Sequence, residues 1–437
     1  MQRFIHSLYS VLFYLALPLI LIRLLLRSRK APLYRRRLAE RFGFCALSSD
    51  FNKNRQTIWI HAVSVGETNA AAPLIRQLQQ HYPALQIMIT TMTVTGSERV
   101  RALFGDSVFH SYVPYDLPAA MNRFLDRLNP ALLVIMETEL WPNMIHCSSR
   151  KGVKLLLANA RLSEKSAQGY RRFSALTADM LDQIDHFAVQ AEADSQRFIS
   201  LGVAGEKLSI TGSLKFNVEI SASHSADGLS SNAFFNVFFK AIKESGRTVI
   251  IAASTREGEE IKVLKAFRQC VDSETGALLL LVPRHPARFD KVARLCQNQG
   301  FEIVRRSQQQ TLLQSTQIVI GDSMGEMMDY YAAADLAFVG GSLVDTGCQN
   351  VLEPAALGLP VLVGPSQFNF ASICAQLEAA GALRTVADEN ELADSLIQLL
   401  QDKNMRQQMG AEGKTLIQAN QQALPALLKI IERLMPD

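Results

Sequence analysis

The cysteines of this 437-residue sequence are few and scattered. There are six, and no two of them have C-x-x-C spacing, which excludes zinc-ribbon and thioredoxin-type motifs. Isolated cysteines of this kind are typical of proteins in a reducing compartment. They are Cys45, Cys147, Cys270, Cys296, Cys348 and Cys374.

Several nucleotide- and metal-binding patterns are also missing. The chain has neither a Walker A sequence nor G-x-G-x-x-G, so nucleoside triphosphate and NAD binding have no motif support. There is no D-x-D pair to chelate a metal–diphosphate, and no zinc-like spacing of histidines and acids. We therefore expect neither a metal nor another cofactor.

Residues 321–325, GDSMG, match the serine elbow of α/β-hydrolases. In that fold the catalytic histidine follows the serine along the chain, but all eight histidines here precede Ser323. Hydrolase chemistry is therefore not expected.

The excess of positive charge is small. The 45 Lys and Arg residues against 41 Asp and Glu residues give a net charge of +4, which is too weak to predict nucleic-acid binding.

Long apolar runs are absent except at the N-terminus, where residues 4–26 are almost entirely apolar. The run is near the lower length limit for a membrane span, and Pro18 and Arg23 interrupt it, so it could cross a bilayer or lie in its interface. No A-x-A site follows it, which disfavours a cleaved signal peptide over an anchor. The positive-inside rule then keeps the rest of the chain on the cytoplasmic face. The basic residues after the run are Arg27, Arg29, Lys30, Arg35, Arg36 and Arg37.

The remaining chain alternates between short Val/Ile/Leu runs and segments of helical period, and 437 residues exceed what one hydrophobic core usually holds. Continuous apolar runs are typical of parallel strands covered on both faces. We therefore expect an α/β protein with two doubly wound, Rossmann-like domains. The expected organisation is an anchor over residues 1–30, an N-terminal domain over 31–220 and a C-terminal domain over 221–437. A Ser/Ala/Gly-rich piece within residues 218–246 is interpreted as the connection.

Residues 57–76, TIWIHAVSVGETNAAAPLIR, change from a strand-like to a helix-like pattern, and Glu67 stands at the change. Ser64 and Glu67 match the capping box, in which both side chains satisfy free backbone N–H groups of a helix start. The same place, beyond the carboxyl end of a strand, is where α/β proteins bind ligands. The pattern alone leaves a structural and a catalytic role open.

Polar residues follow successive predicted strands of the second half, at Ser254, Thr255 and Arg256, at Arg284, within residues 321–325, and at Asn350 and Glu353. Each has a structural explanation alone. Together, at one edge of a parallel sheet, they predict a nucleotide site with an Arg and backbone N–H groups for phosphate and a carboxylate for ribose hydroxyls.

The chain also resembles a known family. EPAALGLPV, residues 353–361, is similar to the donor-site signature of glycosyltransferases with the B-type, two-Rossmann fold. Over most of residues 30–375 the sequence resembles the 3-deoxy-D-manno-octulosonic acid (Kdo) transferases of lipopolysaccharide synthesis. The matching stretches are HAVSVGE, TTMTVTGSERV, VPYDLP, METELWPN, LANARLSEKS, TGSLKF, LVPRHPARF, GDSMGEM, FVGGSLV, NVLEPAA and GPSQFNF.

The resemblance implies transfer of Kdo from CMP-Kdo to a lipid A precursor at the cytoplasmic face of the inner membrane. It implies that Glu67 is the general base and that Glu137 and Lys215 stabilise the transition state. The implied CMP contacts are Pro283, Arg284, Met324, Gly325, Glu326, Asn350, Val351, Leu352 and Glu353, with Ser254, Thr255 and Arg256 as further candidates.

One stretch departs from the family pattern. The family usually has Gly-Gly-His-Asn where this chain has Gly347-Cys348-Gln349-Asn350, so no role for that histidine is carried over. Two other functions are alternatives: a B-type glycosyltransferase with a different nucleotide-sugar donor, and a catalytically inactive, membrane-tethered scaffold.

Overall fold

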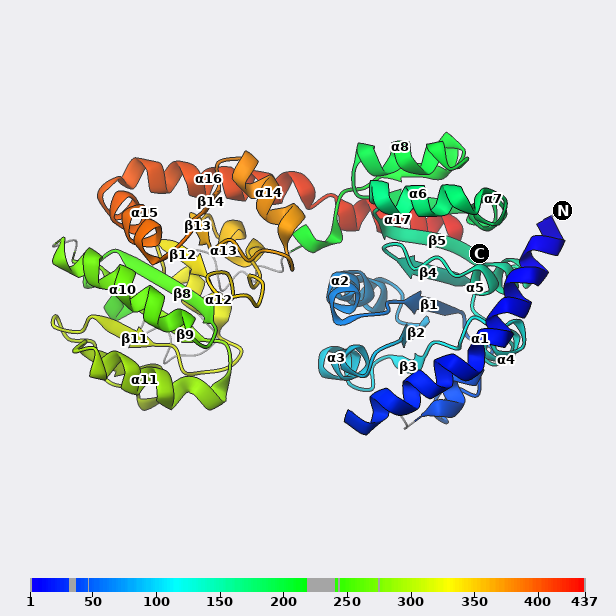
Figure 1. Cartoon of the computed structure of the whole chain (residues 1–437), viewed down its shortest axis with the longest axis horizontal. Coiled ribbons are helices and arrows are strands. Elements are labelled where there is room, and N and C mark those ends of the chain that lie inside the picture. Colours follow the sequence, from blue (N-terminus) through cyan, green and yellow to red (C-terminus); the bar gives the residue numbers. More distant parts are fainter. Residues whose placement is uncertain are drawn as a thin grey trace. The chain divides into compact units, whose positions relative to one another are not determined.

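The computed structural model describes residues 2–30, 37–45, 47–217, 240–242, 244–273 and 276–435, and the chain forms two compact units (Figure 1). Unit 1 holds Met1–Asn217 and the chain from Asn420 onward, and unit 2 holds Val218–Ala419. Arg35, Arg36 and most of the expected interdomain connection lie outside the described residues, as do the side chains of Arg27 and Lys30.

Unit 1 is built on a parallel sheet of strand order β3-β2-β1-β4-β5-β6-β7. This order places β1 between β2 and β4, so the chain reverses its direction of travel across the sheet there. The strands are β1 (Thr57–His61), β2 (Gln86–Thr91), β3 (Phe109–Tyr112), β4 (Leu132–Met136), β5 (Lys154–Ala160), β6 (His186–Val189) and β7 (Leu208–Ile210).

The helices of unit 1 follow the strands as crossovers, which is how parallel strands must be connected. They are α2 (Val65–His81), α3 (Val94–Phe104), α4 (Pro118–Leu128), α5 (Pro142–Arg150), α6 (Glu164–Arg172), α7 (Ser174–Asp182) and α8 (Glu192–Ser200). Short 3-10 turns cover η2 (Leu38–Phe42), η3 (Gly205–Lys207) and η4 (Leu214–Phe216).

Unit 2 repeats this architecture with strand order β10-β11-β9-β8-β12-β13-β14, also parallel. The strands are β8 (Val249–Thr255), β9 (Leu278–Pro283), β10 (Ile303–Arg305), β11 (Ile318–Ile320), β12 (Leu336–Val339), β13 (Val361–Val363) and β14 (Leu383–Thr385). The helices are α10 (Glu259–Asp272), α11 (Phe289–Asn298), α12 (Met327–Ala332), α13 (Leu352–Ala356), α14 (Ala371–Ala379), α15 (Glu389–Gln401) and α16 (Lys403–Asn420), with 3-10 turns η6 (Pro286–Arg288) and η7 (Arg306–Gln308).

The last helix, α17 (Ala423–Leu434), belongs to unit 1. From the sequence alone it is instead expected in the C-terminal domain, residues 221–437. Leu427, Ile430 and Ile431 are buried in one apolar cluster with residues of β1, β2, β4 and β5. The tip of α17 is held by a hydrogen bond from the Tyr82 hydroxyl to Glu432. The apolar face of this helix thus completes one side of the first sheet, which explains its return.

The N-terminal apolar segment forms helix α1 (Gln2–Lys30), and Ile5–Leu26 is long and apolar enough to cross a membrane. The helix nevertheless lies against unit 1 (Figure 1). The Tyr9 hydroxyl donates to Asp116 at 2.9 Å, and the Ser10 hydroxyl donates to Asn143 at 2.9 Å. The opposite face of α1 is exposed and apolar, with Leu15 and Leu19 each 70% exposed. The helix therefore has one docked face and one uncovered face.

The basic segment after α1 is not uniformly a surface feature. Arg37 pairs with Glu40 and donates to the His110 carbonyl, and Arg41 is buried beneath aromatic rings. Arg29 is exposed. Unit 1 therefore uses Arg37 and Arg41 in its own packing, which leaves them unlike the exposed Arg29.

A buried carboxylate organises the loop after β12. Glu259, at the start of α10, accepts hydrogen bonds from the backbone N–H groups of Gly341, Ser342 and Leu343, and from that of Arg256. The donor–acceptor distances lie between 2.7 and 3.0 Å. Its neighbour Glu260 is bound by both Nη atoms of Arg288. The acidic start of α10 is therefore structural.

We predict that Glu259→Gln lowers the free energy of unfolding by at least about 2 kcal/mol, because an amide offers one acceptor oxygen and leaves buried N–H groups unpaired. The measurement is urea unfolding followed by circular dichroism. The control is Glu257→Gln, an exposed partner of Lys291, which should leave the unfolding midpoint unchanged. Equal midpoints for both variants would contradict the assigned role.

Candidate functional site

Glu67 lies at the start of α2, directly beyond β1, in the reciprocal arrangement of a helix cap. The Ser64 hydroxyl donates to Glu67 Oε1 at 2.8 Å and accepts from the Glu67 backbone N–H at 3.4 Å. The second carboxylate oxygen accepts from the backbone N–H of Val63 at 2.8 Å. The capping interpretation is therefore confirmed for Ser64, but the carboxylate reaches Val63 instead of the N-cap N–H of a standard capping box.

The environment of Glu67 favours its protonated form. The residue is only 8% exposed, and burial of its carboxyl raises the pKa from 4.5 to about 7. The hydrogen bonds from Ser64 and Val63 lower the pKa, and the carboxylates of Glu139 and Glu137 raise it further. Burial also raises the pKa of Glu139, which accepts from the Trp141 indole. A carboxyl that titrates near neutral pH is suited to accept and release a proton.

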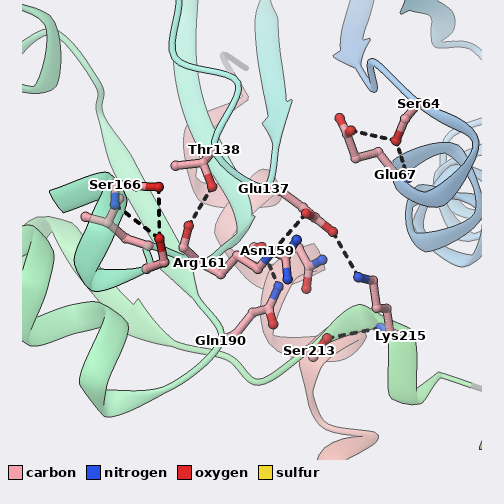
Figure 2. Close-up of polar contacts among 12 residues, drawn as sticks. Ser64, Glu67, Glu137, Thr138, Asn159, Arg161, Ser166, Gln190, Ser213 and Lys215 are labelled. Carbon is pink, nitrogen blue, oxygen red and sulfur yellow. Dashed lines mark hydrogen bonds and ion pairs between the residues drawn. The ribbon is translucent and has the colours of Figure 1, made fainter. Parts of the chain in front are cut away.

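Glu137 stands between two cations (Figure 2). Its Oε2 is 3.0 Å from Arg161 Nε, and its Oε1 is 3.2 Å from Lys215 Nζ. Lys215 belongs to the turn η4, whose start is capped by the Ser213 hydroxyl. The group of three carries one net positive charge. It can therefore bind a further anionic group without losing its internal pairing.

The backbone at these strand ends is unusual. Glu137 has φ 55° and Asn159 has φ 53°, the left-handed region that non-glycine residues rarely occupy. Asn159 accepts from the Leu214 backbone N–H, which links the end of β5 to the turn that carries Lys215. Such conformations cost about 1–3 kcal/mol each and are concentrated at functional sites. Here they direct the chain so that Glu137 and Lys215 meet.

A second group of predicted residues lines a cavity of about 240 Å³ in unit 2. Ser254, at φ 57° on a bulge of β8, occupies one wall. Glu353 accepts from the Asn350 amide at 2.9 Å. Burial raises the pKa of the Glu353 carboxyl, while Asn350 and the nearby charge of Arg284 lower it. The predicted residues that line the cavity are Ser254, Pro283, Arg284, Met324, Gly325, Asn350 and Glu353.

Five predicted residues do not line this cavity. The side chains of Val351 and Leu352 are buried, and Glu326 is turned toward Arg306 and Ser323. Thr255 donates to Glu260, and Arg256 lies within hydrogen-bond distance of His285. Their contact with a donor stays a prediction.

Tyr330, Tyr331 and Gln349 are among the lining residues that were not expected from the sequence. The tyrosines lie on α12, where an apolar helix face is the ordinary interpretation of their pattern. Gln349 replaces the histidine of the family pattern, and this replacement was the only available signal. Among the described residues, no group of three or more His, Cys, Asp or Glu side chains could hold a metal ion.

Comparisons with known proteins identify both halves of the chain. Residues 36–218 match the family model "3-Deoxy-D-manno-octulosonic-acid transferase (kdotransferase)", and residues 248–416 match "Glycosyl transferases group 1". The 3-deoxy-D-manno-octulosonic acid transferase of Haemophilus influenzae is 43% identical over 97% of both chains. That of Bordetella pertussis is 35% identical over 86% of both.

A glycosyltransferase structure from Rickettsia africae has a TM-score of 0.53 at 12% identity, and the match covers 88% of this chain and 100% of that one. At this identity the likeness concerns the fold alone, and it agrees with the expected B-type architecture. The level of identity to the Haemophilus and Bordetella proteins is sufficient to assign the family. The chain is therefore a glycosyltransferase that belongs to the Kdo transferase family.

Proposed function

We propose that this protein transfers Kdo from CMP-Kdo to a sugar hydroxyl of a lipid A precursor, with Glu67 as the general base and without a metal. The observation that carries the proposal is the buried Glu67 carboxyl, whose pKa is raised to about 7. In the reaction the acceptor hydroxyl gives its proton to Glu67, and its oxygen bonds to the anomeric carbon. The bond from that carbon to the phosphate oxygen breaks, and CMP leaves.

The donor is assigned to the cavity of unit 2. Arg284 is exposed at the end of β9 and can meet the single phosphate of a CMP-sugar with charge-assisted hydrogen bonds. Glu353 and Asn350 supply acceptors and a donor for ribose hydroxyls. In a CMP-sugar the phosphate is already bonded to the anomeric carbon. Cations and N–H groups can therefore stabilise the negative charge that develops on the phosphate as it leaves.

Glu137, Arg161 and Lys215 are assigned to transition-state stabilisation. Lys215 can interact with negative charge on the donor while Glu137 remains paired with Arg161. We assign the exposed apolar face of α1 to contact with the inner membrane on its cytoplasmic side, where the lipid acceptor lies.

We predict that Glu67→Gln lowers kcat by roughly 10²–10⁴ while the melting temperature stays close to wild type. Gln can still accept from the Val63 backbone N–H and form a hydrogen bond with the Ser64 hydroxyl, but it cannot take a proton. The measurement is turnover with CMP-Kdo and a lipid A precursor, paired with thermal unfolding. Wild-type turnover in this variant would show that Glu67 is a helix cap only.

The pH profile gives a separate test of the same group. Only the ionised carboxylate accepts a proton, so kcat/KM of the wild type should rise with pH below about 7 and level off above it. The Glu67→Gln variant should lack this rise. A wild-type profile that is flat from pH 5 to pH 8 would contradict the proposed base.

We predict that Lys215→Met lowers kcat by roughly 10²–10³, the usual effect of removing one electrostatic donor from an active site. Glu137 keeps its partner Arg161, so the fold should persist. The control is Lys207→Met, because Lys207 is similarly exposed and also contacts a carboxylate, that of Asp182. Equal kcat values for the two variants would remove Lys215 from the mechanism.

We predict that Arg284→Ala weakens CMP binding by about 1.5–3 kcal/mol, the range for a hydrogen bond to a charged group. Calorimetric titration with CMP is the measurement, and UMP is the comparison that tests the assigned base. The control is Arg294→Ala, which removes an exposed cation of α11 outside the cavity. Unchanged CMP affinity in Arg284→Ala would overturn the phosphate assignment.

A further inference from the structure

A cavity of about 570 Å³ lies between α1 and the rest of unit 1. Its walls are mainly apolar, with Phe13, Ile20 and Leu24 on α1, and Leu140 and Trp141 after β4. A volume of this size, lined by apolar side chains with a few polar groups, is typical of a small-molecule or lipid site. No residue of this cavity belongs to the donor site of unit 2.

One cation in the cavity is buried without a counter-ion. Arg41 is 2% exposed, and its Nε makes no hydrogen bond within the described part of the chain. Its Nη2 donates to the Met92 carbonyl at 3.0 Å, and its guanidinium lies 4.5 Å from the ring centre of Tyr112. No described carboxylate forms an ion pair with it, and residues 31–36 contain none.

Among the described residues that line the same cavity, the one carboxylate already has hydrogen-bond partners. Asp116 accepts from the Tyr9 hydroxyl and from the backbone N–H groups of Asn143 and Met144. It therefore anchors α1 and caps α5, and does not neutralise Arg41. A buried cation is costly unless it is paired, and contact with an aromatic face compensates only in part. An anionic ligand would supply the missing partner.

The cavity connects two features described above. The residues of α1 that line it are on the docked side of the helix, whereas the leucines on its other side are exposed. Val63 also lines it, and the backbone N–H of Val63 is the group that binds the Glu67 carboxylate. The cavity therefore extends from α1 to Val63, whose backbone N–H binds the proposed base.

We propose that this cavity binds a phosphate-bearing lipid, with an acyl chain against Ile20, Leu24 and Leu140 and the anionic group at Arg41. That this lipid is the acceptor rests on the proposed function. The binding site itself does not, because it follows from the cavity, the unpaired cation and the docked helix.

Tryptophan fluorescence tests the site directly. The chain has two tryptophans, of which Trp141 lines the cavity and Trp59 is fully buried in the sheet core. Full-length protein in neutral detergent is titrated with phosphatidic acid that carries brominated acyl chains. We expect saturable quenching, and about tenfold weaker binding of phosphatidylcholine with the same chains. Displacement by an equal concentration of inorganic phosphate would indicate a simple anion site and overturn the lipid assignment.

Matched variants complete the test. Arg41→Gln should weaken phosphatidic acid binding about tenfold, whereas Arg29→Gln, which removes an exposed cation, should not change it. If Arg41→Gln does not fold, Ile20→Phe narrows the cavity, and Leu19→Phe on the exposed face of α1 is its control. If a variant and its control bind phosphatidic acid equally, in whichever of the two pairs is measured, the inference is overturned.

The assay needs neither donor nor turnover, so the two proposals fail separately. Saturable, Arg41-dependent quenching in a protein that transfers no Kdo would support the cavity and refute the proposed function. Kdo transfer with equal lipid binding in each variant and its control would refute the cavity alone.

Discussion

Parallel pairing of strands is the constraint on which the rest of this structure depends. All strands of a parallel sheet end at the same edge, so the residues that follow them gather there whatever their distance in sequence. In unit 1 this edge carries Glu67 after β1, Glu137 after β4 and Lys215 after β7. In unit 2 the same rule places Arg284 and Asn350 on one cavity. The left-handed residues Glu137, Asn159 and Ser254 mark where the chain turns sharply to achieve this.

Two buried glutamates at helix starts show how hydrogen bonding decides what a carboxylate can do. Glu259 accepts hydrogen bonds from four backbone N–H groups, three of which hold the loop after β12 in place. Glu67 accepts one backbone N–H and one hydroxyl, and neighbouring carboxylates oppose its ionisation. Burial raises the pKa of both carboxyls, to about 7 at Glu67, while four backbone hydrogen bonds lower the pKa of Glu259. The difference in partners separates a cap from a candidate base.

Much of the fold could be predicted because buried parallel strands are continuous apolar runs, as in LLVIM and ALLLLVP. The strands that escaped prediction are β3, FHSY, and β14, LRT, which lie at sheet edges and contain polar residues. Side-chain partners were harder to predict than strands. That Glu137 pairs with Lys215 depends on strand order, and that Arg41 is buried depends on aromatic rings distant in sequence. Local sequence patterns contain neither kind of information.

The return of α17 to unit 1 has a consequence for how the protein is made. Part of one face of the first sheet is covered by Leu427, Ile430 and Ile431, which the ribosome adds after all of unit 2. Unit 1 therefore cannot complete its apolar core as an independent N-terminal domain during synthesis, because this part of the core arrives with the last helix. For the same reason, cutting the chain once at residue 217 does not yield two complete domains.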